Sequence, residues 1–352
     1  MKGVTPKQVP ELRAHMVDWC GTSGSMGAAT MLAFLFGNVE EGDTVGQATP
    51  TEMDARIGSA LAKRTGASLS VAELYHVTKG KMPEVLEAAK EIPQNMQVQR
   101  HWFHVDHGFM AFENGYTTRA YYPDEGSINF GSNSGDNIIG SRNQTQIYGI
   151  SWSITGETIR VLAWTDAQHF LRLAASEHFQ DFAKKEGLTD RRALMRMVSS
   201  RVAETSPLIV AGQYMVKLDK YLSHAKAEHR AALRILLSAC LMLKQYTTAA
   251  SIVHTPRSSL SFINRINPHL GKQVTVIDKR EIKANSGNAE VERDAPKRQL
   301  SVRFERRGHW REYKHEKWSE ELREHPIWIP AHWMGHEGLP LATTTKVTRL
   351  KR

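Results

Sequence analysis

Apolar residues in the N-terminal part of the chain have helical spacing. This spacing covers residues 10–36 in two pieces, residues 51–65 and residues 82–91. Pro83 lies near the first turn of the last segment, where a helix accepts proline because the missing amide would have no partner. The pattern therefore predicts several short helices before any strand.

The spacing changes between residues 99 and 165, where apolar and polar residues alternate as they do along strands. Glu113-Asn114-Gly115 interrupts the first alternating run, and Ile154-Thr155-Gly156-Glu157 separates two later runs. Short segments of this kind join antiparallel strands. We therefore expect two hairpins and a sheet of four or more strands in this region.

Helical spacing returns at Asp166, a good N-cap residue, and continues with breaks to about residue 250. The segment HRAALRILLSACLMLKQY is so apolar that it predicts the central core helix. Cys240 within it is expected to be a small buried residue rather than a nucleophile. Together these segments predict an α+β fold for a main domain at residues 1–254.

The C-terminal third of the chain divides into two parts. Prolines, glycines and polar residues are frequent from 255 to 298, which predicts an extended linker apart from a possible strand at QVTVI. Residues 299–352 predict a small C-terminal β module that begins with the strand QLSVRFE and ends on the basic tail KVTRLKR.

Charge and composition narrow the possible partners of this 352-residue chain. A formal net charge of +9 favours a polyanionic partner, nucleic acid before membrane. The chain lacks both the apolar run of a membrane span and the apolar stretch of a signal peptide. Two cysteines predict neither a disulfide framework nor a zinc cluster, so we expect a reducing cytosol and no cofactor.

The stretch HWFHVDHGF, residues 101–109, is similar to the His-x-His-x-Asp-His loop of metallo-β-lactamases, but Trp102 stands at the first ligand position. Strand alternation would point His107 away from His104 and Asp106. The following residues, FMAFENGYTTRAYY, continue as a hairpin rather than as Gly-Gly and a helix. We therefore interpret the stretch as a strand without metal, and a metal-dependent hydrolase as the alternative.

Half of the eight tryptophans lie in the C-terminal module, between residues 310 and 333, interleaved with arginine, histidine and tyrosine. Aromatic rings stack on bases and arginine pairs with phosphate, so this combination is typical of single-stranded nucleic-acid binding. The residues expected to contact nucleic acid are Arg306, Arg307, Trp310, Arg311, Tyr313, Trp328 and Trp333.

On a strand, Arg307, His309 and Arg311 share one face, opposite Trp310. Such a face is suited to gripping a phosphate chain, or to metal-independent cleavage of RNA through its 2′-hydroxyl. The candidate catalytic residues are therefore His309, Arg307, Arg311 and His332. In the structural alternative, the tryptophans pack on the main domain and the arginines stack on them.

The fragments VRFERRGHWREY, PIWIPAHWMG and GLPL resemble a C-terminal signature of phage and mobile-element proteins. They are similar to the type V-A anti-CRISPR family that suppresses production of a Cas effector during its translation. WFHVDHGFMAFENG and RILLSACLML resemble that family's strand pair and apolar helix, whereas the insert KHEKWSEELREH is longer and more acidic than a tight hairpin needs. The resemblance carries over to Arg307, Gly308, His309, Trp310, Arg311, Trp328, Pro330, His332 and Gly335.

The resemblance implies a phage or mobile-element regulator in the cytoplasm of a host bacterium. Such a regulator lowers expression of a host or competitor gene through message binding or decay coupled to translation. RNA is its expected partner, with the ribosome or a nascent peptide, and no membrane. A hydrolase with metal on His104, Asp106 and His107, and a non-enzymatic nucleic-acid or protein-binding factor, are the alternatives. Oligomeric state and enzyme status stay open.

Overall fold

The computed structural model describes residues 3–21, 52–93, 95–119, 144–168, 206–222, 227–243, 245, 248–279, 304–306, 308–313, 315 and 317–334. The helices within these ranges are α1 (Val9–Gly21), α3 (Glu52–Val71), α4 (Met82–Glu91), α8 (Ala227–Leu243), α9 (Arg257–Ile266) and α10 (Glu320–Glu324), with short 3₁₀ turns η1 (Pro6–Gln8) and η2 (Arg100–Trp102).

The seven strands of the main sheet follow the order β5-β4-β3-β2-β1-β7-β6. β1 runs parallel to its neighbours β2 and β7, and every other pair in the sheet is antiparallel. Their bounds are β1 (Glu73–Val77), β2 (His107–Arg119), β3 (Gln144–Thr155), β4 (Thr158–Asp166), β5 (Leu208–Lys217), β6 (Thr248–His254) and β7 (Gln273–Lys279). Four short strands near the C-terminus form a small β module, so the predicted α+β fold is confirmed.

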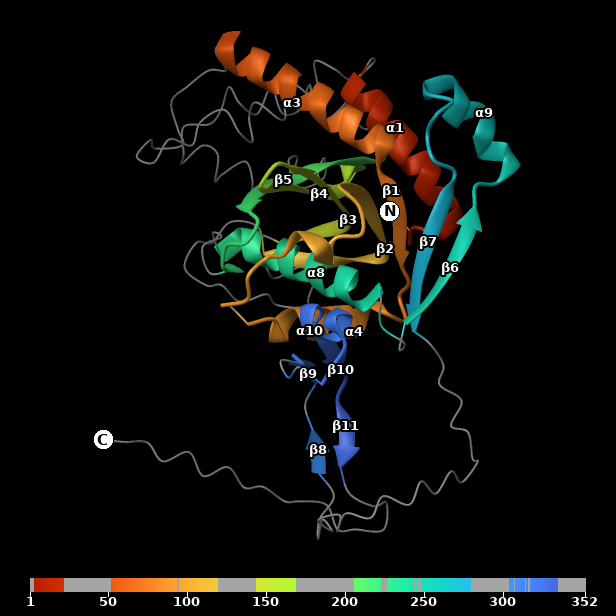
Figure 1. Cartoon of the computed structure of the whole chain (residues 1–352). Coiled ribbons are helices and arrows are strands. Elements are labelled where there is room, and N and C mark those ends of the chain that lie inside the picture. The colour runs from red at the N-terminus through yellow and green to blue at the C-terminus, as the bar shows by residue number, and fades with distance from the viewer. Residues whose placement is uncertain are drawn as a thin grey trace, which may run out of the picture.

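Helices cover both faces of the main sheet (Figure 1). Phe109 and Ala111 of β2 pack in one cluster with residues of α1 and α3, whereas Met110 and Phe112 pack in a second cluster with α4 and α8. Because both faces of β2 are buried, its sequence GFMAF is continuously apolar instead of alternating.

A buried cation joins the elements on one side of the sheet. The Arg13 guanidinium on α1 donates to the carbonyls of Leu69 and Ala72, at the end of α3, and of Gly271, before β7. Burial lowers the pKa of Arg13 to about 10, so the side chain still carries its charge at neutral pH. The charge is thus held by backbone dipoles from segments far apart in the sequence.

Several predicted elements are confirmed. α4 spans Met82–Glu91, as its spacing predicts. The β3–β4 hairpin turns at Gly156, whose φ of 57° costs glycine little because it lacks a Cβ. Cys240 is buried in α8, and burial raises the pKa of its thiol to about 12, so it stays protonated at neutral pH.

The predicted hairpin turn at Glu113-Asn114-Gly115 is wrong. β2 continues through this segment to Arg119, and its pairing with β3 shifts register between Ala111 and Tyr116. The Glu113 carbonyl accepts a hydrogen bond of 2.7 Å from the Val4 amide. The Asn-Gly segment therefore forms a bulge, next to which the Glu113 carbonyl pairs with the N-terminal segment, instead of reversing the chain.

The interpretation of residues 101–109 as one strand is also wrong. η2 occupies Arg100–Trp102, and β2 begins only at His107. Trp102 and Phe103 are both buried, so the aromatic character of this segment serves the core and not an alternating strand face.

The helical region and the linker need correction as well. β5 (Leu208–Lys217) lies at one edge of the sheet, within the segment expected to be helical to about residue 250. The expected linker 255–298 instead contains α9 and β7, and β7 pairs with β1 inside the sheet. The strand predicted at QVTVI is confirmed as β7, so the main domain extends to at least residue 279. Residues 280–298 lie outside the described part.

Within the described residues, the helices are too short or too polar to cross a membrane.

Because His76 of β1 is buried, we expect the folded protein to lose stability in acid. Its Nε2 donates to the Val4 carbonyl at 2.7 Å, and burial lowers its pKa below the ordinary value of about 6.5. The unfolded chain therefore binds this proton more tightly, and stability is lost as the pH falls below about 6.5 and through the folded pKa. We expect His76 to lower the free energy of unfolding by up to about 1.4 kcal/mol for each pH unit between about pH 7.5 and 5. Urea unfolding across this pH range measures the change.

His76→Gln keeps an N–H for the Val4 carbonyl but has no titrating proton, so we expect a flatter pH dependence. The exposed His269 provides the matched control, and His269→Gln should keep the wild-type slope. Equal slopes for His76→Gln and wild type would contradict the prediction.

Candidate nucleic-acid interface

The C-terminal module is one two-stranded ribbon. β9 (His309–Arg311) pairs antiparallel with β10 (Ile327–Ile329), and β8 (Phe304–Arg306) pairs antiparallel with β11 (His332–Met334). The register carries across the break without a slip, because Ile329 faces His309 and His332 faces Arg306, three residues further along each strand. Pro330 lies at the break and lacks an amide for the ladder.

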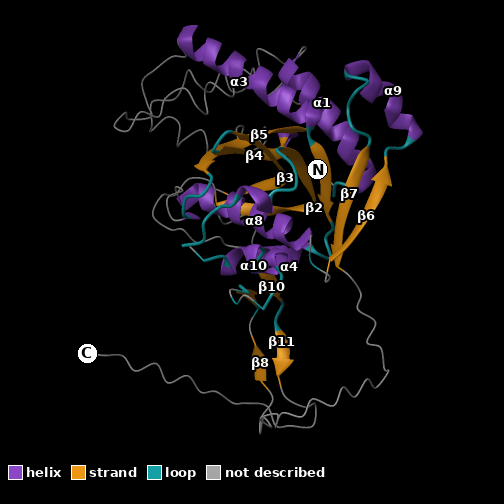
Figure 2. Cartoon of the chain, viewed as in Figure 1, coloured by secondary structure: helices purple, strands orange, loops and turns teal. Residues whose placement is uncertain are grey.

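The ribbon has a root on the main domain and a projecting tip. β9 and β10 lie next to α4 and α10, whereas β8 and β11 extend away from the sheet and its helices (Figures 1 and 2). The root is therefore shielded by the main domain and the tip is not.

Two tryptophans anchor the root. Trp328 is 1% exposed and belongs to the same core cluster as the apolar residues of α4 and α8. Trp310 packs against it with ring centroids 5.4 Å apart and donates from Nε1 to the Ala88 carbonyl of α4 at 2.9 Å. Gly308 lies so close that a Cβ there would come within 2.5 Å of the Trp328 ring.

The expected base contact by Trp328 is therefore wrong, because stacking requires an exposed ring face. Trp310 also takes the structural role, with its indole N–H engaged by the main domain. Both residues thus pack on the main domain, as the structural alternative expects of the tryptophans.

A second contact joins the C-terminal module to the main domain. The Trp102 Nε1 donates to the Glu324 carbonyl at 3.1 Å, and the His101 Nε2 lies 3.2 Å from that same oxygen. The segment read as a strand in the sequence is thus the part of the main domain that receives α10.

A cation–aromatic cluster lies on the loop that follows β9. The Tyr313 and Trp318 rings meet edge to face with centroids 4.8 Å apart. Arg311 lies over the Tyr313 ring at 4.7 Å, and Lys317 lies over the Trp318 ring at 5.2 Å. Both cations are exposed and both rings are half-buried, so the cluster presents charge and aromatic surface together. Trp318 was missed as a site residue, although its position beside Lys317 was a signal.

The ribbon tip carries the remaining predicted contacts. Trp333 on β11 is 50% exposed, and Arg306 on β8 is exposed and faces His332 across the ladder. The tip thus combines an accessible indole with a cation, which are the two groups that single-stranded binding needs. Arg307 lies outside the described residues.

The predicted catalytic set is not assembled at one place. His309 pairs with Ile329 on β9–β10, whereas His332 pairs with Arg306 on β8–β11, so the two histidines lie in separate strand pairs. The His332 Nδ1 lies 3.0 Å from the Pro330 carbonyl, close to its own backbone.

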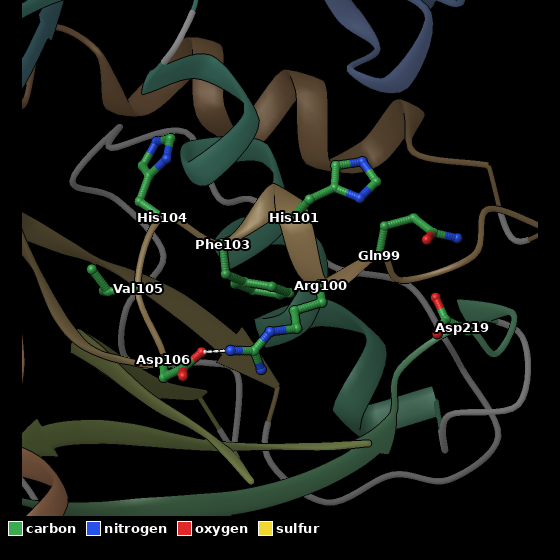
Figure 3. A pocket seen from close by; sticks show the side chains of 8 residues that line it. All are labelled: Gln99, Arg100, His101, Phe103, His104, Val105, Asp106 and Asp219. Carbon is green, nitrogen blue, oxygen red and sulfur yellow. Dashed lines mark hydrogen bonds and ion pairs between the residues drawn. The ribbon is translucent and has the colours of Figure 1, made fainter. Parts of the chain in front are cut away.

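The alternative metal site of a hydrolase does not form either. His107 Nδ1 lies 3.0 Å from Ser68 Oγ of α3, and Asp106 forms an ion pair with Arg100. Figure 3 shows the His104 ring pointing away from Asp106. Within the described ranges, no metal-ligand group combines these three residues.

An open hollow of about 660 Å³ occurs along the η2–β2 segment. Gln99, Arg100, His104 and Asp106 line it together with Asp219, which follows β5 (Figure 3). The sequence did not indicate it, because the hollow depends on Arg100–Trp102 forming a 3₁₀ turn rather than a strand.

No known protein-family model matches the chain, and no curated protein is similar to it. The resemblance to the anti-CRISPR family therefore stays a prediction from the sequence fragments.

Replacing the buried Trp328 should lower the free energy of unfolding far more than replacing the exposed Trp333. Trp328→Ala leaves a cavity in the core and is expected to lower the free energy of unfolding by about 3–5 kcal/mol. Trp333→Ala changes an exposed position and should stay within about 0.5 kcal/mol of wild type. Urea unfolding of the full chain measures both.

Trp328→Phe refines the test. The Trp328 N–H has no hydrogen-bond partner among the described residues, so phenylalanine removes little besides volume and should destabilise less than alanine. A Trp328→Ala protein as stable as wild type would show that the ribbon root is not part of the core.

Proposed function

We propose that the protein binds single-stranded RNA through the C-terminal ribbon tip and the adjacent cation–aromatic cluster. The observation that carries this proposal is the separation of roles among the aromatic residues of one ribbon. Trp328 is buried in the core and Trp310 packs against it, whereas Trp333 and the Tyr313–Trp318 pair lie beside exposed cations. A purely structural module has no need for the second group.

The physical basis is stacking combined with phosphate pairing. Each base that stacks on an aromatic side chain contributes about 1–3 kcal/mol with little dependence on base identity. Arg306, Arg311 and Lys317 supply charge for the phosphates, and the net charge of +9 attracts a polyanion over a longer range. This supports RNA recognition by shape and charge more than by sequence.

We propose binding rather than cleavage. The histidines expected to act as acid and base, His309 and His332, lie in separate strand pairs of the ribbon. Without such a pair, metal-independent cleavage through the 2′-hydroxyl has no positioned proton donor and acceptor among the described ribbon residues.

The biological role that we propose follows from the sequence resemblance. Two of the fragments that resemble the anti-CRISPR signature, VRFERRGHWREY and PIWIPAHWMG, contain the ribbon strands. We propose a phage or mobile-element regulator that binds a message during translation and lowers its expression, with the ribosome or a nascent peptide nearby.

Binding to a labelled single-stranded oligouridine, measured by fluorescence anisotropy, tests the interface. Trp333→Ala and Trp318→Ala should each weaken binding by about 5- to 150-fold, the equivalent of one lost stacking contact. Arg311→Ala should reduce the slope of log affinity against log salt by about 0.7, because one phosphate contact is lost.

Arg265→Ala is the matched control. Arg265 lies 5.3 Å over the Phe262 ring on α9, which is the same kind of pair on a part of the molecule distant from the ribbon (Figure 1). It should leave the affinity unchanged. Wild-type affinity for both tryptophan variants would refute the proposed interface.

Whole-cell RNA sequencing after brief induction tests the biological role. We expect particular transcripts to fall with wild type and with Arg265→Ala, but not with an Arg306→Ala/Trp333→Ala variant. If no transcript responds to the wild-type protein, the regulatory role fails even where RNA binding holds in vitro.

A further inference from the structure

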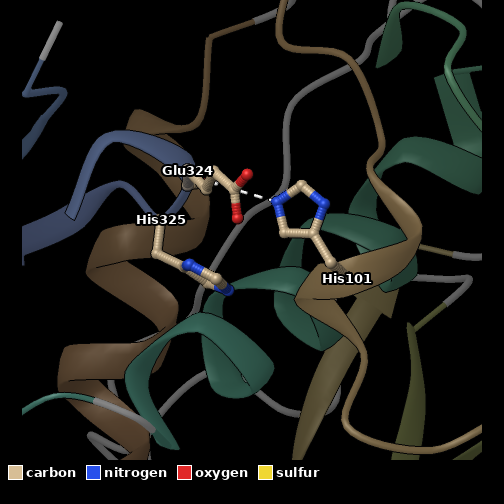
Figure 4. Close-up of side chains that lie close together, drawn as sticks. All are labelled: His101, Glu324 and His325. Atoms are coloured by element: carbon tan, nitrogen blue, oxygen red, sulfur yellow. Dashed lines mark hydrogen bonds between the residues drawn. The ribbon is translucent and has the colours of Figure 1, made fainter. Parts of the chain in front are cut away.

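Two histidines and a glutamate meet at the junction between the main domain and the C-terminal ribbon. His101 belongs to η2, and Glu324 and His325 lie at the end of α10 and directly after it. One ligand atom from each lies within 4.8 Å of the others, and the two imidazole centroids are 5.0 Å apart. Figure 4 shows Glu324 and His325 facing the His101 ring from the opposite segment.

The residue types suit a divalent transition-metal ion. Two imidazoles and one carboxylate form a common three-ligand set for zinc, with a fourth position left for water. Ligand atoms around tetrahedral zinc lie about 2.0–2.2 Å from the ion, hence about 3.5 Å from each other. The cluster is wider than this, and rotation of the exposed His101 and Glu324 side chains closes the difference.

The local hydrogen bonds allow this rotation. The His101 Nε2, which faces the cluster, shares the Glu324 carbonyl with the Trp102 Nε1. When His101 turns its lone pair to an ion, the Trp102 N–H still donates to that carbonyl at 3.1 Å. Metal binding therefore leaves no buried backbone oxygen without a donor.

We propose that His101, Glu324 and His325 bind one divalent transition-metal ion of the zinc class. Because the ligands come from segments 223 residues apart in the sequence, the ion links the ribbon to the main domain. Metal binding then stabilises the docked ribbon, since a ligand that binds only the folded arrangement shifts the equilibrium toward it. This site is independent of RNA binding.

Isothermal titration of zinc into the metal-free full chain tests the site. We expect one strong site per chain in the wild-type protein. His101→Ala and His325→Ala should each weaken it by at least about 10- to 100-fold, the loss that follows removal of even a supporting partner of a ligand. Zinc should raise the unfolding midpoint of wild type but not that of His325→Ala.

His269→Ala controls for weak binding by the other surface histidines among the sixteen in the chain, and should bind zinc like wild type. Without metal, His269→Ala should have the wild-type unfolding midpoint. For His101→Ala and His325→Ala the measured quantity is the change in midpoint on adding zinc, because His101 also contacts the Glu324 carbonyl. The proposal is overturned if wild type has no strong site, or if His101→Ala and His325→Ala bind zinc as wild type does.

Discussion

The burial of Trp328 is the interaction on which the C-terminal ribbon depends. A ribbon of two short strands is only marginally stable alone in water, so its root needs a larger core to pack against. Trp328 enters the cluster formed by α4 and α8, and Trp310 adds a ring contact and a hydrogen bond to Ala88. With its root held in this way, the ribbon can extend Trp333 away from the main domain.

The sheet of the main domain is covered by helices on both faces. Helices α1 and α3 cover one face, and the charged Arg13 ties them to the segment before β7 through backbone carbonyls. On the other face, α4 and η2 receive the ribbon through Ala88 and Trp102. The proposed RNA interface, the docking of the ribbon and the proposed metal site therefore all involve this second face or what projects from it.

The functional alternatives differ in whether the side chains that each one needs lie close together. His104, Asp106 and His107 point to different neighbours, which removes the basis for a hydrolase centred on them. His309 and His332 lie in separate strand pairs, and we propose binding rather than cleavage. Cations and half-exposed rings do converge on the loop after β9, and this arrangement needs no catalytic geometry to hold a nucleic acid.

Local spacing in the sequence by itself determined the helix Met82–Glu91 and the turn at Gly156, because each depends on neighbours within a few residues. Only the tertiary structure decided the bulge at Glu113–Gly115, where the Val4 amide takes the hydrogen bond that a hairpin turn would have made internally. It also decided which tryptophans are anchors and brought together ligand side chains from distant segments. Composition records that a residue is aromatic or basic, but burial depends on partners that the chain meets only when folded.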